Sequence, residues 1–212
     1  MRDQSNRLLL VDLDGTLLRG NSLPVFLINV LGWWKLILGL PLLLLGWIGV
    51  VIRCGIQSGK LKESLLCHYF KGQHRATMEA LGEKCAMGKL IFMLNPMVEQ
   101  PLKEAQMNGE TVVLVTASLD IWVKPLARYM GMMVLCTEVE YDSQDLFTGR
   151  FATPNCKYSE KKRRILEKFD VEKYDRVVAF GNSKGDAAMF ELADEVWWVE
   201  RDGRLICLKT AE

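Results

Sequence analysis

The stretch "LLLVDLDGTLL", Leu8 to Leu18, joins an apolar run to two aspartates that stand two positions apart. The run from Arg7 to Val11 is typical of a buried parallel strand, and it ends at Asp12. Asp and Gly are ordinary turn residues, but two acids at the mouth of a buried strand repel each other unless a cation joins them. The stretch therefore predicts an α/β fold with a polar site at the end of its first strand.

The rest of the chain continues this pattern after residue 94. Apolar runs predict strands over 111–115, 132–139, 176–180 and 195–199, a turn lies within 141–150, and 203–208 closes the chain. Helices are expected within 95–110 and over 120–131, 159–169 and 185–194. Such alternation predicts right-handed βαβ units, which build a Rossmann-like parallel sheet with helices on both faces.

Polar residues follow three of these strands at the point where each one ends. Asp12 and Asp14 follow the first strand, Thr116 to Ser118 the second, and Gly181 to Asp186 the fourth. In parallel sheets the ligand binds beyond the carboxyl ends of the strands, so these segments are expected to meet. Carboxylates there suit Mg²⁺, and with a metal present one aspartate can attack phosphorus while the other transfers protons.

Four ordered motifs resemble those of the haloacid dehalogenase-like hydrolase superfamily and cover nearly the whole chain. "DLDGTL" (12–17) resembles motif one, and "VLVTAS" (113–118) resembles motif two. "NCKYSEKKRRIL" (155–166) resembles motif three of the phosphoserine-phosphatase-like branch, and "GNSKGD" (181–186) resembles motif four. The resemblance implies a phosphatase that works through an aspartyl-phosphate intermediate.

The resemblance assigns a role to each motif residue. It implies that Asp12 is the nucleophile and Asp14 the general acid/base, and that Thr116 and Lys161 hold the phosphoryl group. The expected substrate-binding positions are Gly15, Thr16, Ala117 and Ser118, and the expected Mg²⁺ ligands are Asp12, Asp14, Asn182 and Asp186. Lys157 is the alternative to Lys161 for the motif-three role.

One position departs from the family pattern. Asn182 stands where motif four usually has its first acid, which leaves Asp186 as the carboxylate of that loop. An amide oxygen can bind Mg²⁺ but brings no charge. The sequence therefore favours an active enzyme and leaves open a catalytically weak protein that binds phosphate at a membrane.

The family resemblance also implies a helical cap between the first two strands, here residues 19–94, with the core formed by 1–18 and 95–212. The cap contains the stretch "LPVFLINVLGWWKLILGLPLLLLGWIGVVIRCG" (23–55), which has no charged residue between Leu36 and Ile52. A helix of a small bundle should show one polar face. The stretch is therefore expected to contact a membrane, with burial within the cap or an oligomer as the alternative.

A broken helical hairpin over about 23–52, lying in or dipping into one leaflet, is the expected form. Its halves, separated by Gly32, Lys35 and Pro41, offer roughly 15 and 17 residues, whereas a span needs about 20. Trp33, Trp34 and Trp47 suit the headgroup level. An apolar cap insert of this kind resembles those of phosphatidylglycerophosphatases of this superfamily and of phosphatase domains fused to UbiA-type prenyltransferases.

Composition sets the remaining expectations. A formal net charge of +1 gives no reason to expect nucleic acid as a partner, and six widely spaced cysteines are typical of reduced thiols. The first 15 residues lack the pattern of a signal peptide, so we expect a protein at the cytoplasmic face of a membrane. The expected substrate is a phosphorylated lipid or polyprenyl chain, with a small soluble metabolite such as phosphoserine as the alternative.

Overall fold

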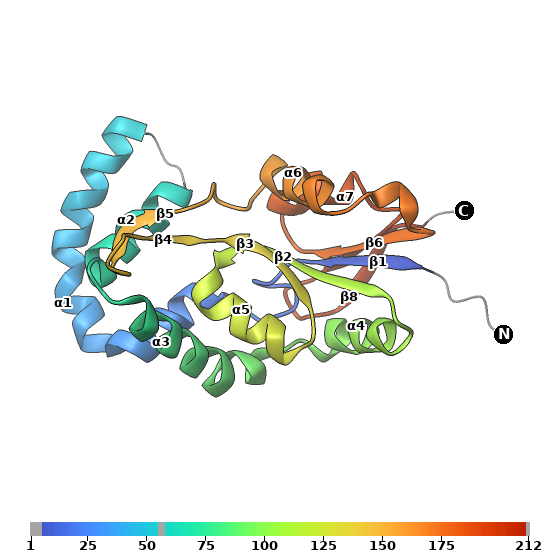
Figure 1. The fold of residues 1–212 in the computed structure, drawn as a ribbon, viewed down its shortest axis with the longest axis horizontal. Coiled ribbons are helices and arrows are strands. Elements are labelled where there is room, and N and C mark those ends of the chain that lie inside the picture. Colours follow the sequence, from blue (N-terminus) through green and yellow to red (C-terminus); the bar gives the residue numbers. More distant parts are fainter. Residues whose placement is uncertain (1–5, 55–57, 211–212) are drawn as a thin grey trace.

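The computed structural model describes residues 6–54 and 58–210 and contains a six-stranded sheet at its centre (Figure 1). The strand order is β3-β2-β1-β6-β7-β8. The strands are β1 (Arg7–Val11), β2 (Thr111–Leu119), β3 (Met133–Thr137), β6 (Arg176–Gly181), β7 (Glu195–Val199) and β8 (Leu205–Lys209). The first five are parallel, as predicted, whereas β8 at the edge runs antiparallel to β7.

Strand β1 lies in the middle of the sheet because both of its faces are apolar. Leu8 and Leu10 belong to one cluster of buried residues, and Leu9 and Val11 belong to the other. Residues that alternate along a strand point to opposite faces, so an uninterrupted apolar run requires a cover on each side. This placement brings the end of β1 between the ends of β2 and β6.

Helices cover the two faces of the sheet and complete the expected three layers. Helices α4 (Pro96–Met107) and α5 (Asp120–Tyr129) pack on one face, and α6 (Ser159–Lys168) and α7 (Ala187–Phe190) pack on the other (Figure 1). Helix α7 is preceded by a short 3-10 helix, η3 (Lys184–Asp186), and η2 (Val171–Lys173) follows α6. The predicted helix over 185–194 is therefore shorter than expected.

The helical insertion after β1 is present. It contains α1 (Ser22–Cys54), α2 (Ser58–Phe70), α3 (Arg75–Gly88) and the 3-10 helix η1 (Leu90–Met93). The chain leaves and re-enters the core at adjacent points, because Leu18 and Leu94 form an antiparallel bridge. Two backbone hydrogen bonds flank it, from Arg19 N to Met93 O at 2.8 Å and from Asn95 N to Leu17 O at 2.8 Å.

A β-hairpin that the sequence analysis did not anticipate joins this insertion. Strands β4 (Val139–Tyr141) and β5 (Phe147–Phe151) form their own two-stranded sheet, which packs against α2 and bridges to His74 (Figure 1). The predicted turn within 141–150 is present and joins the two strands, whereas the prediction of one continuous strand over 132–139 was wrong. The strand ends at Thr137 because the next two backbone N–H groups donate to side chains, to Thr153 Oγ1 at 2.9 Å and to Asp120 Oδ1 at 3.2 Å.

Helix α1 is bent at one residue. Gly32 has φ of 70° and ψ of 164°, a left-handed conformation that favours glycine, and the helical backbone resumes beyond it through Pro41. The backbone forms two helical segments that meet at Gly32, one of the positions where the sequence was expected to divide, and the hairpin over about 23–52 stays a prediction. The side chains of residues 40, 42–46 and 48–54 lie outside the described part of the chain, so the membrane contact of the second segment also stays a prediction.

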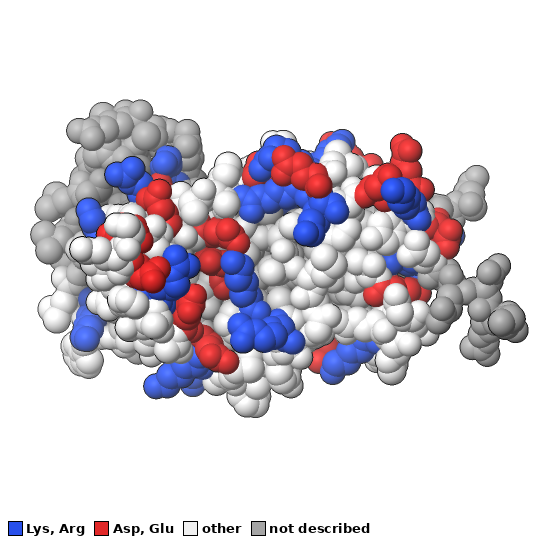
Figure 2. Space-filling model, in the orientation of Figure 1, with Lys and Arg blue, Asp and Glu red and all other residues white. Residues whose placement is uncertain are grey.

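Near the bend, large apolar side chains of α1 face outward. Trp33 is 64% exposed, Trp34 78% and Leu38 76%, and Ile37 is also exposed. Among the described residues, one stretch, Ser22–Gly39, is long and apolar enough to cross a membrane by length and composition, and 17% of it is buried. On the face of the molecule in Figure 2, acidic and basic side chains are interspersed rather than gathered in one large field.

Candidate active site

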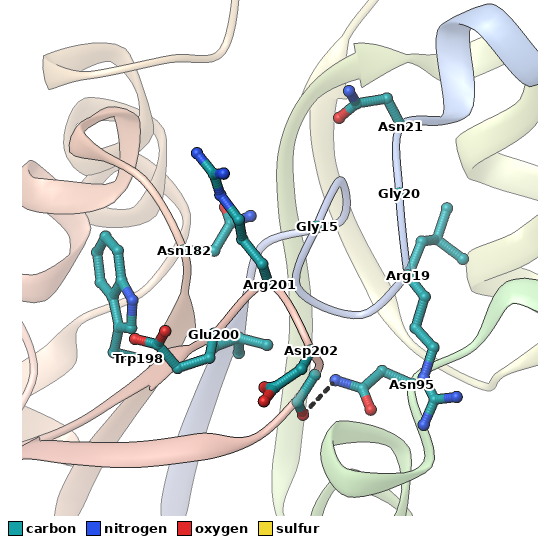
Figure 3. Close-up of a pocket in the computed structure, with 13 residues that line it drawn as sticks. Gly15, Arg19, Gly20, Asn21, Asn95, Asn182, Trp198, Glu200, Arg201 and Asp202 are labelled. Atoms are coloured by element: carbon teal, nitrogen blue, oxygen red, sulfur yellow. Dashed lines mark hydrogen bonds between the residues drawn. The ribbon is translucent and has the colours of Figure 1, made fainter.

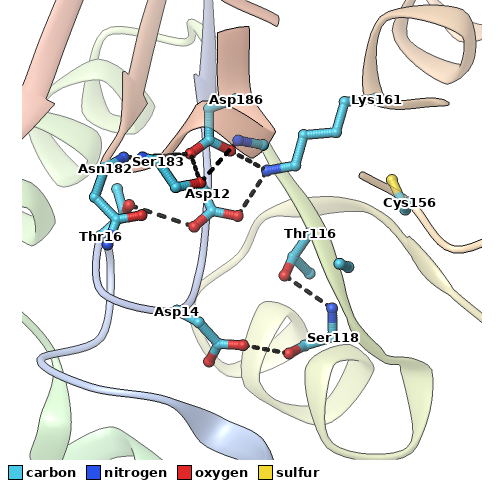
Figure 4. Close-up of polar contacts among 12 residues, drawn as sticks. Asp12, Asp14, Thr16, Thr116, Ser118, Cys156, Lys161, Asn182, Ser183 and Asp186 are labelled. Carbon is cyan, nitrogen blue, oxygen red and sulfur yellow. Dashed lines mark hydrogen bonds and ion pairs between the residues drawn. The ribbon is translucent and has the colours of Figure 1, made fainter. Parts of the chain in front are cut away.

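The carboxyl ends of β1 and β6 bring three charged side chains into direct contact (Figure 4). Lys161 Nζ lies 2.6 Å from Asp12 Oδ1 and 2.6 Å from Asp186 Oδ1. Lys161 comes from the first turn of α6, Asp12 follows β1, and Asp186 ends η3. All three side chains are buried, so their charges interact with little screening by solvent. Lys157, the alternative for the motif-three role, lines the same pocket, and which lysine has that role stays a prediction.

The two carboxylates share a single ammonium group, and the pKa values of Asp12 and Lys161 reflect this. Burial, together with the charge of Asp186, raises the pKa of Asp12 to about 7 against the opposing attraction of Lys161. Burial lowers the pKa of Lys161, but Asp12 and Asp186 outweigh it and raise the value to about 12. Lys161 is therefore a permanent cation, and the group of three carries excess negative charge once Asp12 ionises.

Asp14 lies near this group but faces other partners. Its Oδ1 accepts a hydrogen bond from Ser22 N at 2.6 Å, and its Oδ2 accepts one from Ser118 Oγ at 2.5 Å (Figure 4). The structure thus brings Asp12 and Asp186 together and turns Asp14 toward the start of α1. The role of Asp14 as a metal ligand stays a prediction.

The motif-four loop is held by hydrogen bonds to Asp186. Asp186 Oδ2 accepts from Ser183 Oγ at 2.8 Å, Ser183 N at 3.0 Å and Asn182 N at 3.3 Å. The side chain of Asn182 packs on Gly15, where an added Cβ would lie 2.0 Å from Asn182 Nδ2. Gly15 also has φ of 76°, so both the space and the backbone require glycine there. Ser183 was not among the predicted site residues.

The predicted phosphate loop follows an irregularity in β2. The pairing of β2 with β3 shifts between Thr116 and Leu119, and such bulges re-aim side chains near active sites. Ser118 N donates to Thr116 Oγ1 at 3.1 Å, while Thr16 Oγ1 donates to Asp12 Oδ2 at 3.3 Å. The Ser118 hydroxyl, predicted to bind substrate, donates to Asp14 in this structure.

One lysine of the insertion, which was not among the predicted site residues, reaches the site. Lys62 of α2 lines the same pocket as Asp12, and its ammonium donates to Ala117 O and, at 2.8 Å, to Asn155 Oδ1. Burial lowers the pKa of Lys62 to about 8, although the charge of Asp14 opposes the change. The sequence carried no sign of this contact, because Lys62 stands in no motif and only the packing of α2 brings it to the cavity.

The catalytic candidates line a cavity of about 460 Å³ that the core and the insertion form together. Its lining includes Asp12, Asp14, Thr116, Lys161 and Asp186, with Leu23 and Pro24 from the start of α1. A larger cavity of about 730 Å³ lies beyond Gly15 and Asn182, where Arg19, Trp198 and Arg201 line it (Figure 3). The larger cavity holds none of the catalytic carboxylates, so the chemistry belongs to the smaller one.

The donor set fits a divalent cation in part. Asp12 and Asp186 are adjacent buried carboxylates whose excess negative charge a cation would relieve, and Asn182 adds a neutral amide beside them. Within the described residues, no group of three His, Cys, Asp or Glu side chains stands ready to hold a metal. The reason is visible in the geometry: Lys161 lies between Asp12 and Asp186, and Asp14 faces Ser118.

Comparisons with known proteins agree with this architecture. The family model described as haloacid dehalogenase-like hydrolase matches residues 9–191. Protein CicA from Caulobacter vibrioides is 29% identical over 138 residues, which are 65% of this chain, and the match spans 62% of CicA's own length. The chain thus spans less than two thirds of the length of this relative.

Two solved structures share the fold. A protein of unknown function from Bordetella pertussis Tohama I superposes with a TM-score of 0.72 at 19% identity, covering 91% of this chain and 89% of that one. A phospho-aspartyl intermediate analogue of phosphoserine phosphatase superposes with a TM-score of 0.62 at 17% identity, covering 91% and 85%. At these identities the likeness extends to the fold.

We expect Lys161→Met to destabilise the protein strongly and in a pH-dependent way. Removing the cation leaves two buried carboxylates together, which should cost about 3–5 kcal/mol of unfolding free energy. Asp12 has a folded-state pKa of about 7, above its ordinary value of 3.8, and loss of Lys161 raises it further. Asp12 is ionised in the unfolded state of both proteins at these pH values. In the folded state it ionises above pH 7 in the wild type, whereas in the variant it keeps its proton to higher pH. The stability lost in the variant should therefore grow by about 1–2 kcal/mol between pH 6 and 8.5.

Urea unfolding at the two pH values measures both effects, and Lys162→Met is the matched control. Lys162 is the next residue of α6, and its ammonium pairs with Glu191 at 2.7 Å on the surface. Its loss should cost no more than about 1 kcal/mol and show no such pH trend. Equal losses in the two variants would contradict the central role of Lys161.

Proposed function

The chain belongs to the haloacid dehalogenase-like hydrolase family, and from that premise we propose that it is a Mg²⁺-dependent phosphatase for a phosphorylated lipid. The observation that carries the proposal is the shared cavity. It has the Asp12–Lys161–Asp186 group at one side and the first residues of the exposed apolar helix α1, Leu23 and Pro24, at another. A phosphate on a membrane lipid would thus reach Asp12 beside an apolar surface.

The proposed reaction has two steps. An oxygen of Asp12 attacks phosphorus, the bond from phosphorus to the ester oxygen breaks, and Asp14 gives its proton to the departing alkoxide. Asp14 then takes a proton from water, whose oxygen attacks the phosphorus of the aspartyl-phosphate and releases inorganic phosphate and the free Asp12 carboxylate. The structural neighbour solved as a phospho-aspartyl intermediate analogue supports this chemistry.

Charge around Asp12 has a defined part in this scheme. Asp12 attacks as a carboxylate, and Lys161 opposes the rise in its pKa that burial causes. Lys161, Thr116 and the backbone N–H groups after Thr116 would hold the transferring phosphoryl oxygens. Mg²⁺ held by Asp12, Asp186 and Asn182 would supply further positive charge for the phosphoryl group.

The membrane part of the proposal is supported by the exposed residues of α1. Trp33, Trp34 and Leu38 lie within one short stretch of α1, and each is more than half exposed. Lys35, which lies between Trp34 and Leu38, is also exposed. Tryptophans with a flanking lysine are typical of helices that lie at the membrane interface. We place the membrane at this side of the insertion and propose that the catalytic part lies on its cytoplasmic face.

We expect wild-type protein to release phosphate from phosphatidylglycerophosphate in mixed micelles with Mg²⁺ at a higher kcat/KM than from its deacylated form. The head groups are identical, so a preference isolates the contribution of the acyl chains. An excess of about tenfold or more corresponds to at least about 1.4 kcal/mol of extra binding in the transition state. Phosphate release is measured beside Asp12→Asn, which should be inactive.

The other outcomes separate the alternatives. Equal rates with both substrates, or turnover of phosphoserine alone, would support a small-metabolite phosphatase and remove the lipid from the proposal. Binding of inorganic phosphate without turnover of any ester would support a phosphate-binding protein with Asn182 in the metal loop.

We expect the double substitution Trp33→Ser, Trp34→Ser to weaken binding to anionic lipid vesicles by about tenfold or more, because two large apolar side chains no longer enter the interface. Cosedimentation with vesicles measures the partitioning. The control is Phe92→Ser, which removes an exposed aromatic ring, 80% exposed, from η1 rather than α1. Equal loss in both proteins would show that α1 is not the contact surface.

We expect saturating Mg²⁺ to raise the thermal unfolding midpoint of the wild type by several degrees. A ligand at 100 times its dissociation constant stabilises the folded state by about 2.7 kcal/mol, or roughly 5–10 °C for a chain of this size. Asp186→Asn removes a charged ligand and should abolish most of the shift, whereas Glu191→Gln on the surface should retain it. Differential scanning fluorimetry with and without Mg²⁺ measures the shift of the unfolding midpoint. An undiminished shift in Asp186→Asn would exclude Mg²⁺ binding at this site.

A further inference from the structure

A chain of side-chain hydrogen bonds ends on Asp14. Trp122 Nε1 donates to Ser22 Oγ at 2.9 Å, Ser22 Oγ lies 3.0 Å from Ser118 Oγ, and Ser118 Oγ donates to Asp14 Oδ2 at 2.5 Å. Trp122 belongs to α5 of the core, whereas Ser22 is the first residue of α1 in the insertion. Ser118 stands at the bulge of β2. The start of the insertion and the junction of β2 with α5, which are far apart in sequence, therefore meet through this chain.

The chemistry of the groups fixes the direction of the chain. An indole N–H can only donate, so Ser22 Oγ accepts from Trp122 and keeps its own hydrogen for Ser118. Ser118 Oγ in turn accepts from Ser22 and gives its hydrogen to the carboxylate, which can only accept when ionised. Each donor therefore has one acceptor, and every bond points toward Asp14.

The surroundings make the arrangement stiff. Ser22 and Trp122 have no exposed surface and Ser118 is 5% exposed, so a hydroxyl left without its partner would find little water to replace it. The ring of Trp122 stacks on Phe26 with centroids 4.6 Å apart. Ser22 also binds Asp14 directly, because its backbone N–H donates to Oδ1 at 2.6 Å. Both carboxylate oxygens are thus held, and each retains a second lone pair for proton transfer.

We infer that Trp122 and Ser22 are positioning residues for Asp14, acting through Ser118 to aim its carboxyl group at the departing oxygen of the substrate. The inference rests on the proposed function, in which Asp14 is the general acid. Because Ser22 begins α1, it also ties the orientation of Asp14 to the helix that carries the exposed tryptophans. Neither Ser22 nor Trp122 would contact the substrate in this role.

The experiment exploits the leaving group. p-Nitrophenolate departs without a proton, whereas an alkoxide needs one from Asp14. A misoriented Asp14 carboxyl group should therefore slow the cleavage of alkyl phosphates more than that of aryl phosphates. We expect Ser22→Ala to lower kcat/KM about tenfold for glycerol phosphate or the phosphorylated lipid and less than about twofold for p-nitrophenyl phosphate. The loss is smaller than the roughly 100-fold or more that general acid catalysis contributes, because Asp14 itself stays in place. The ratio kcat/KM reports steps up to formation of the aspartyl-phosphate, so later hydrolysis does not mask the effect.

Trp122→Phe provides a second variant that removes the N–H but keeps an aromatic ring against Phe26. It should show the same selective loss, which covers the case in which Ser22→Ala does not fold. Phe26→Leu is the matched control, because it disturbs the packing around Trp122 and leaves the hydrogen bonds in place. It should lower the unfolding midpoint without changing the ratio of alkyl to aryl activity.

The outcomes separate this inference from the function on which it rests. Equal losses for both esters in Ser22→Ala and Trp122→Phe, or an equally selective loss of alkyl-ester activity in Phe26→Leu, would reduce the chain to a structural role while the phosphatase activity stands. If wild-type protein cleaves neither ester, the proposed function fails and the inference fails with it.

Discussion

The contact of one buried ammonium with two buried carboxylates is the constraint on which this structure depends. Lys161 can reach Asp12 and Asp186 only if β1 and β6 are neighbours and α6 packs across the end of the sheet, as they do. Charges in such a setting lose their hydration, and a buried pair returns little net stability compared with apolar residues of the same size. The group is therefore better explained by chemistry than by stability, since in the proposed reaction Asp12 is the nucleophile and its neighbours control its ionisation.

The core of the fold could be predicted because its information is local. The apolar runs around Leu9 and Val113 have the length and the uninterrupted character of strands covered on both faces, and the order of strands and helices leaves few topologies. Asp12, Lys161 and Asp186 could be predicted to meet because they stand at strand ends or follow a recognisable motif. The parallel arrangement then requires that those ends share one edge.

What the sequence did not reveal depends on contacts between distant segments. The hairpin of β4 and β5 forms because α2 offers it a surface, and "YDSQDLFTGR" by itself is typical of a turn. The inward direction of Lys62 and the orientation of Asp14 are choices among rotamers that only the assembled cavity decides. A break at Gly32 was expected together with breaks at Lys35 and Pro41, but the sequence alone did not tell at which of the three the helix bends.

The junction at Leu18 and Leu94 has a consequence for how proteins of this kind diversify. The two connections lie side by side and are hydrogen-bonded to each other, so the ends of the insertion are as close together as the ends of a short loop, whatever the length of the insertion. Lengthening such a loop adds little closure entropy. A cassette of helices could thus be exchanged, enlarged or made more apolar over evolutionary time while strand pairing and the buried ion group stay intact. The reaction and the choice of molecule on which it acts can then change independently, except where a residue such as Ser22 binds both parts together.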